Sequence, residues 1–136
     1  MSADLAFVTR VMRDPRVWRS VAEDGLDPLT FNADANAHYF QHGEQGFLMF
    51  RQISTCMFEI HIAMLKGARG VDQFVEDTMQ QMHELGARKF LATLPEWNRA
   101  GIAIAERSGF KHEGRVADAY MRQGKLHAMV LMGKTL

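Results

Sequence analysis

The hydrophobic positions of the first part of the chain repeat with helical spacing. A first helix is expected over residues 5–12, where Leu5, Val8 and Met12 share one face. Asp14-Pro15 predicts the cap and first turn of a second short helix, which buries its apolar side chains near Trp18. Residues 32–40 predict a third short helix that begins at Asn32 and ends near Gly43.

From Gly46 onward the pattern changes to short apolar runs rich in aromatic and β-branched residues, which are typical of strands. These runs alternate with two helical segments. In chain order the expected elements are a hairpin over 46–65 with a turn near Ser54, a helix over 71–85, a buried strand over 89–95, a helix over 98–108 and a final hairpin around Gln123-Gly124. This order predicts an α+β fold with helices on the faces of a mixed sheet.

Length and charge exclude several classes of protein. The 136 residues fit a single domain spanning 1–136. Sixteen basic residues balance sixteen acidic ones, which argues against a nucleic-acid partner. The single Cys56 is interpreted as a small buried apolar residue in a reducing compartment. No stretch approaches the ~20 apolar residues that span a bilayer, so a cytoplasmic protein without a membrane partner is expected.

The segment from Glu59 to Gly70 combines a strand that carries an acidic residue with a glycine-containing basic loop at the start of a helix. The first turn of a helix has unpaired N–H groups and a partial positive charge, so with Lys66 and Arg69 it could bind a pyrophosphate. An ordinary connection between a strand and a helix explains the same residues. The loop alone therefore indicates an anion site only weakly.

A second informative stretch runs from Leu94 to Phe110. Asn98 precedes a helix of small residues that ends at Gly109-Phe110. Asn98 is either a helix N-cap or a ligand-binding amide, and its position suits both. The small side chains along this helix would let it approach a neighbour closely.

Taken together, these stretches resemble the GNAT family of acetyl-CoA-dependent N-acetyltransferases. The resemblance covers Gly46 to the C-terminus and is greatest to the subgroup that acetylates protein N-termini, including those of ribosomal proteins. It depends on order and spacing: Glu59 to Gly70, then Asn98, Gly109-Phe110 and Glu113-Gly114. In that subgroup the strand equivalent to the one with Glu59 is the fourth. No convincing first strand precedes Gly46, so a trimmed GNAT fold is expected.

The resemblance implies a three-layer α/β/α fold with a mostly antiparallel sheet and acetyl-CoA as co-substrate. The strands that carry Glu59 and Leu91 would diverge and hold the pantetheine arm between them. Residues 1–45 would line the acceptor side, and 46–136 would form the cofactor-binding core. The implied cofactor contacts are Ile62, Met64, Lys66, Ala68, Arg69, Gly70, Val71, Asn98 and Ala103.

Acetyl transfer requires a neutral amine, a thioester in line with it and donors for the developing oxyanion. Glu59 is the first candidate base if apolar neighbours raise its pKa, with a paired structural carboxylate as the alternative. His61 lies on the same face of the strand and is the second candidate base, with a core histidine as the alternative. Tyr120 is the candidate proton donor to the leaving thiolate, or else a packing residue. No His/Cys spacing indicates a metal site.

Three positions depart from the family pattern. The phosphate loop has Gly67 in place of Gln or Arg, and Asp72 in place of the final Gly or Ala. Asp72 is expected to compete with a pyrophosphate. Ala105 stands where many members have a catalytic Tyr. An N-acetyltransferase acting on a primary amine, such as a protein N-terminus, is therefore weighed against an inactive GNAT-like scaffold, such as a phage virion component. A homo-oligomer or a virion partner is open in either case.

Overall fold

The computed structural model describes residues 4–136. Two short helices come first, α1 over Leu5–Met12 and α2 over Pro15–Val21. Asp4 and Asp14 cap them by accepting hydrogen bonds from first-turn N–H groups, and Pro15 occupies the start of α2. A 3-10 turn, η1, follows at Pro28–Thr30. The two helices predicted from apolar spacing are thus confirmed.

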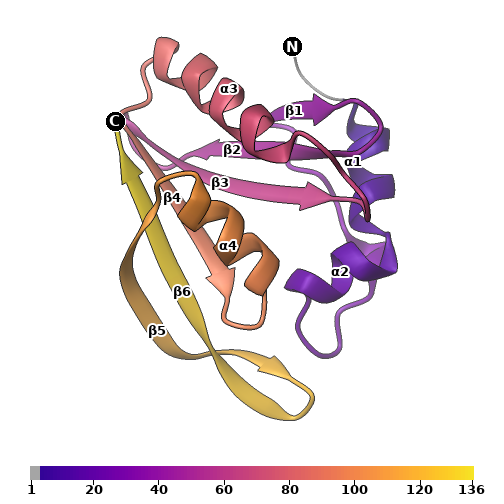
Figure 1. Ribbon diagram of the computed structural model, residues 1–136. Helices are drawn as coiled ribbons and strands as arrows, with labels where there is room; N and C mark the ends of the chain where they lie inside the picture. The colour runs from indigo at the N-terminus through magenta and orange to yellow at the C-terminus, as the bar shows by residue number, and fades with distance from the viewer. Residues whose placement is uncertain (1–3) are drawn as a thin grey trace.

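Six strands form a single sheet (Figure 1). They are β1 His38–His42, β2 Gly46–Gln52, β3 Met57–Met64, β4 Lys89–Pro95, β5 Lys111–Arg122 and β6 Lys125–Thr135. Their order in the sheet is β1-β2-β3-β4-β6-β5. Only the β3–β4 pair is parallel, and every other pair is antiparallel. Both predicted hairpins and the predicted strand over 89–95 are confirmed.

The predicted helix over 32–40 is wrong. Residues 38–42 form strand β1, which pairs with β2 from His38↔Phe50 to His42↔Gly46. Tyr39 is buried at 4% exposure in this arrangement and packs edge-on against Phe47 at 5.7 Å. Pairing with an apolar neighbouring strand therefore overrides the local helical signal. Strand β1 thus lies before Gly46, where no convincing first strand was expected.

Two apolar clusters place helices on both faces of the sheet. Helix α3 (Val71–Glu84) and helix α4 (Arg99–Arg107) cover one face, where Phe50, Phe90 and Met82 are fully buried. Helices α1 and α2 contribute to the cluster on the other face. This is the expected three-layer α/β/α arrangement. In the part of the chain that the structure describes, no helix is long and apolar enough to cross a membrane.

The β5–β6 hairpin is irregular where it passes the α2 side of the molecule. Pairing jumps from Val116↔Met129 to Tyr120↔His127, and Asp118 within the bulge has a φ of 54°. Beyond the bulge, the hairpin turn is bound to the segment after α2, because Asp24 accepts hydrogen bonds from the N–H groups of Gln123 and Gly124 at 2.9 and 3.0 Å. The bulge and this attachment place the hairpin tip beside α2.

Candidate active site

Strands β3 and β4 diverge along their length. They pair only at Met57↔Lys89, Phe58↔Phe90 and Glu59↔Leu91, although β3 continues to Met64 and β4 to Pro95. Beyond Glu59 the edge of β3 that faces β4 has no strand partner. Its backbone N–H and C=O groups are therefore available to a ligand lying between the strands. The divergence expected at Glu59 and Leu91 is present.

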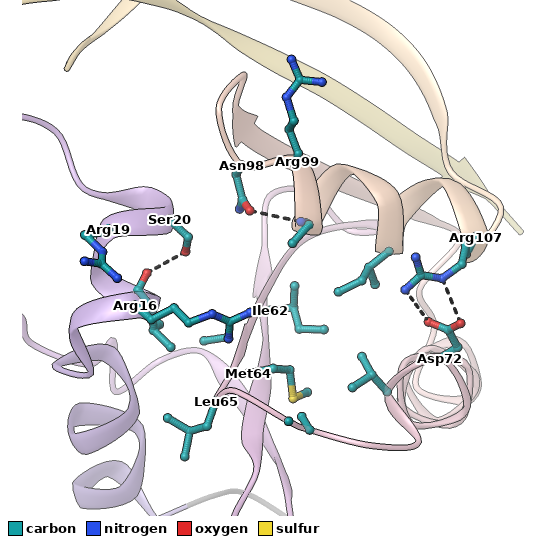
Figure 2. A pocket seen from close by; sticks show the side chains of 18 of the residues that line it. Arg16, Arg19, Ser20, Ile62, Met64, Leu65, Asp72, Asn98, Arg99 and Arg107 are labelled. Carbon is teal, nitrogen blue, oxygen red and sulfur yellow. Dashed lines mark hydrogen bonds and ion pairs between the residues drawn. The ribbon is translucent and has the colours of Figure 1, made fainter. Parts of the chain in front are cut away.

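A cavity of about 760 Å³ opens at the ends of these strands. Its walls come from α2, the end of β3, the β3–α3 loop, the start of α3 and helix α4 (Figure 2). Arg122 of β5 also lines it. A smaller cavity of about 60 Å³ lies in the slot between β3 and β4, and it shares Ile62, Asn98, Gly101 and Ile104 with the larger one. The larger volume falls in the range of small-molecule sites.

The β3–α3 loop is held from behind by the β1–β2 turn. Gln45 Oε1 accepts a hydrogen bond from the Arg69 N–H at 2.6 Å, and His42 Nε2 lies 2.6 Å from the Arg69 carbonyl. The His42 ring also stacks on Phe74 of α3 at 4.5 Å. These contacts fix the backbone just ahead of Gly70, the residue that starts α3 in the left-handed region with a φ of 68°.

No side chain caps the N-terminus of α3, a helix of 14 residues, so its first-turn N–H groups remain available to an anion. Of the predicted cofactor contacts, those that line the larger cavity are Ile62, Met64, Ala68, Gly70, Val71 and Asn98. Lys66, Arg69 and Ala103 line neither cavity. Lys66 and Arg69 are exposed, and the peptide of Arg69 is already bound by Gln45 and His42.

Asp72 does not face the loop as an isolated negative charge. Its carboxylate accepts two hydrogen bonds from Arg107 of α4, from Nε at 3.0 Å and from Nη2 at 3.2 Å. Figure 2 shows this pair bridging α3 and α4 at one side of the cavity. Arg107 therefore offsets the charge that was expected to compete with a pyrophosphate.

Asn98 has the first of the two roles predicted for it, that of a helix N-cap. Its Oδ1 accepts a hydrogen bond from the Gly101 N–H at 3.1 Å, which makes it the N-cap of α4, and its side chain also lines both cavities. Gly101 is required by this close packing, since a Cβ there would lie 2.7 Å from Asn98 Nδ2 and 2.8 Å from Leu94 Cδ2. Ser108 Oγ, which has no hydrogen-bond partner among residues 4–136, lies at the lining of the smaller cavity.

Glu59 is a paired carboxylate. It is 9% exposed, forms an ion pair with Arg51, and its Oε1 lies 3.0 Å from His61 Nε2. The pKa of Glu59 lies below its ordinary value, mainly because His61 donates a hydrogen bond to it; burial opposes this effect and the Arg51 charge adds to it. The expectation that apolar neighbours raise this pKa is therefore wrong. Glu59 lines neither cavity, whereas His61 lines the smaller one.

Tyr120 lies in a group of aromatic side chains beside the cavity. It packs edge-on against Trp97 at 5.6 Å, and Trp97 Nε1 donates a hydrogen bond to the Ser20 carbonyl of α2 at 3.0 Å. Burial raises the pKa of Tyr120, and the negative charges of Glu23 and Glu59 raise it further. Tyr120 itself lines neither cavity, whereas Trp97 lines the larger one.

The sequence did not reveal the arginines that gather around the larger cavity. The arginine side chains that line it are Arg16, Arg19, Arg99, Arg107 and Arg122, and Asp72 is the single acidic lining residue. Two of these arginines lie on α2, two on α4 and one on β5, so no sequence motif connects them. Their clustering appears only when the elements are assembled in space.

Comparisons with known proteins give a fold but no sequence match. No protein-family model matches the chain. A comparison with curated protein sequences also found no match. Solved structures, in contrast, match well. A putative phosphinothricin N-acetyltransferase aligns over 100% of this chain and 96% of its own, with a TM-score of 0.77 and 16% identity. The chain has the GNAT acetyltransferase fold.

Two further solved structures share this GNAT fold, and the chain covers a smaller part of each of them. A probable GNAT-family acetyltransferase from Chromobacterium violaceum aligns over 96% of this chain and 77% of its own, with a TM-score of 0.72 and 20% identity. The microcin C7 self-immunity acetyltransferase MccE aligns over 74% and 62%, with a TM-score of 0.63 and 18% identity. The chain spans only 54% to 58% of the length of several other matched acetyltransferases. Among residues 4–136 the strand with Glu59 is the third, whereas its equivalent in the subgroup named above is the fourth.

Proposed function

We propose that this protein transfers an acetyl group from acetyl-CoA to a primary amine. The observation that supports this most directly is the divergence of β3 and β4 beyond the Glu59↔Leu91 pair, with a cavity of about 760 Å³ at the uncapped start of α3. A slot with free backbone groups suits an extended amide-bearing arm, and a positively polarised helix start suits a diphosphate. Both features occur at the same edge of the sheet.

The residues present fit acetyl-CoA. The first-turn N–H groups of α3 would bind the diphosphate, with Gly70 giving the backbone close access and Arg107 adding positive charge. Asn98 Nδ2 and the free edge of β3 near Ile62 would bind the amide groups of the pantetheine arm. The structure of MccE, which shares the fold, was determined with acetyl-CoA and AMP. When bound, acetyl-CoA supplies an activated thioester as the acyl donor.

His61 is the group that we assign as general base. Its Nε2 donates to the ionised Glu59 at 3.0 Å, so in the neutral ring Nδ1 carries the free lone pair. Nδ1 would take a proton from the amine as the amine nitrogen attacks the thioester carbonyl carbon and the C–S bond breaks. Glu59 would orient the ring and stabilise the imidazolium that results.

Tyr120 is the group that we assign as proton donor to the departing thiolate. Its ring packs at 5.6 Å against Trp97, which lines the larger cavity. Backbone N–H groups on the free edge of β3, near Ile62 to Met64, would stabilise the negative charge that develops on the carbonyl oxygen. Ala105, at the position where many relatives have a Tyr, is 8% exposed and cannot donate a proton.

The acceptor is proposed to be a primary amine, and a protein N-terminus is one candidate because of the order and spacing of the motifs from Glu59 to Gly114. A second candidate function is that of an inactive scaffold in a larger assembly such as a virion. Two observations favour the scaffold: Asp72 occupies the first turn of α3 and is paired with Arg107, and Ala105 replaces a hydroxyl.

Two measurements separate the two candidates. Calorimetric titration reports whether coenzyme A binds, and detection of free thiol reports acetyl transfer when acetyl-CoA is incubated with a panel of amines. We expect saturable coenzyme A binding and thiol release that depends on the amine. If millimolar cofactor gives neither a heat of binding nor release of free thiol, the protein is an inactive scaffold. The matched control variant is Arg10→Gln, because Arg10 is exposed, pairs with Glu44 and lies outside both cavities.

A further inference from the structure

The larger cavity has an excess of positive charge on the wall opposite α3. Arg16, Arg19 and Arg122 line it from α2 and β5, and none of them has a carboxylate within 4.0 Å among residues 4–136. Asp72, the single acidic lining residue, is already paired with Arg107 on the other wall. Unpaired arginines in a concave site raise the local concentration of anions.

The side chain of Arg122 is held by specific contacts. Arg122 Nη1 donates to the Arg19 carbonyl at 3.1 Å, and the Arg122 guanidinium carbon lies 4.6 Å from the centroid of the Trp97 ring. Figure 2 shows Arg16 reaching from α2 into the cavity, toward Ile62 on the free edge of β3. A held guanidinium with unused N–H groups is suited to bind a carboxylate or phosphate.

These cations lie at the reaction end of the cavity. Arg122 is two residues after Tyr120 on β5, and Trp97 packs against both of them, at 4.6 Å from Arg122 and 5.6 Å from Tyr120. The groups assigned to the phosphates of acetyl-CoA, the start of α3 and Arg107, are on the opposite wall. An anion bound by Arg16 and Arg122 would therefore sit beside the thioester.

We propose that the acceptor is a small primary amine that also carries a carboxylate or a phosphate, and that Arg16, Arg19 and Arg122 bind this anionic group. This inference rests on the proposed acetyl transfer and specifies its substrate class. Binding of the anion would hold the amine near His61, which lines the slot between β3 and β4.

Pairs of amines that differ in one anionic group test the inference: a free amino acid against its amide, and phosphoethanolamine against ethanolamine. We expect kcat/KM for the anionic member to exceed that of its neutral partner by about 10- to 100-fold. Arg16→Gln and Arg122→Gln should each reduce this preference about tenfold, Arg122→Lys should keep part of it, and Arg10→Gln should leave it unchanged. In these variants the Kd of coenzyme A should stay within about threefold of its original value.

Three results would overturn the inference: equal use of neutral and anionic amines, preferred use of a peptide N-terminus without acidic groups, or a weakened coenzyme A affinity in Arg16→Gln and Arg122→Gln with an unchanged preference. The last result would assign these arginines to the nucleotide. Direct titration of the amines into the protein with and without coenzyme A needs no turnover. Binding of anionic amines without acetyl transfer would contradict the proposed function and support the substrate class, whereas absence of binding would refute the substrate class.

Discussion

His61 Nε2 lies 3.0 Å from Glu59 Oε1 on one face of β3, and the same carboxylate is paired with Arg51. Glu59 was expected to be either the base or a paired structural carboxylate, and this arrangement favours the second role for Glu59 and the base role for His61. Glu59 is ionised and has its charge satisfied, so it is a poor base. His61, which lines the slot between the strands, has one ring nitrogen fixed and the other free.

Replacement of His61 tests this assignment of roles. We expect His61→Asn to lower kcat by about 10²- to 10⁴-fold, the range that a positioned general base contributes, while the Kd of coenzyme A changes little. Steady-state kinetics together with calorimetric titration would show it. If His61→Asn weakened coenzyme A binding by the same factor by which it lowered kcat, His61 would instead belong to the cofactor site.

Glu59 should make stability depend on pH in the acid range. Its folded-state pKa is below the ordinary value of 4.5, so its contribution to stability is fully present above that value and is lost as pH falls through the lower, folded pKa. In Glu59→Gln this acid-dependent loss should be smaller. The substitution should also cost about 1–3 kcal/mol of unfolding free energy at neutral pH, since it removes a charged partner from two hydrogen bonds.

The measurement is urea unfolding of the original protein and of Glu59→Gln at several pH values below neutrality. Arg10→Gln serves as the control, because the Arg10–Glu44 pair is largely exposed and contributes little. Parallel stability curves for the original protein and Glu59→Gln would contradict the assignment.

The Asp72–Arg107 pair predicts a gain in cofactor affinity when Asp72 is removed. Asp72→Ala takes away a negative charge at the start of α3 and frees Arg107 for a phosphate, so the Kd of coenzyme A should fall by about 3- to 10-fold at low salt. Arg107→Gln should raise it. Both effects should shrink at high ionic strength, because the side chains are half exposed. Weaker binding by Asp72→Ala would mean that Asp72 positions Arg107 and does not compete with the cofactor.

Gly101→Ala should disturb both the fold and the slot. The new Cβ would lie 2.7 Å from Asn98 Nδ2 and 2.8 Å from Leu94 Cδ2, so the N-cap of α4 or the end of β4 must move. Such overpacking costs about 1–3 kcal/mol, which exceeds the helix propensity that alanine gains. Thermal unfolding and coenzyme A titration would both report the change. An equally stable variant with unchanged affinity would show that the packing here is looser than described.

The sequence predicted the cofactor side of the fold well, because the signals there are local. The helix over 71–85 follows from apolar spacing and a closing glycine, and Asn98 with Gly109 marks both ends of α4. The divergence of the strand pair beyond Glu59 was implied by the resemblance to the GNAT family. The signals for the two helices depend on residues close together in the chain.

The sequence could not predict what depends on distant partners. Strand β1 is a strand because Tyr39 and Phe40 pair with β2, and local turn signals pointed to a helix instead. Lys66 and Arg69 look like phosphate ligands in the sequence, yet Gln45 and His42 hold the Arg69 peptide and the two side chains lie outside the cavity. The arginine cluster joins α2 to β5, across a sequence separation of 103 residues between Arg19 and Arg122.

The bulge around Asp118 bends the β5–β6 hairpin. It turns the hairpin tip toward α2, where Arg122 and Asp24 join two segments from opposite ends of the chain. The β3–α3 loop, which lies on the side proposed to bind acetyl-CoA, takes no part in these hydrogen bonds. Substitutions near this bend are therefore expected to change the α2 side of the larger cavity, where the proposed amine would bind, before they change the slot between β3 and β4.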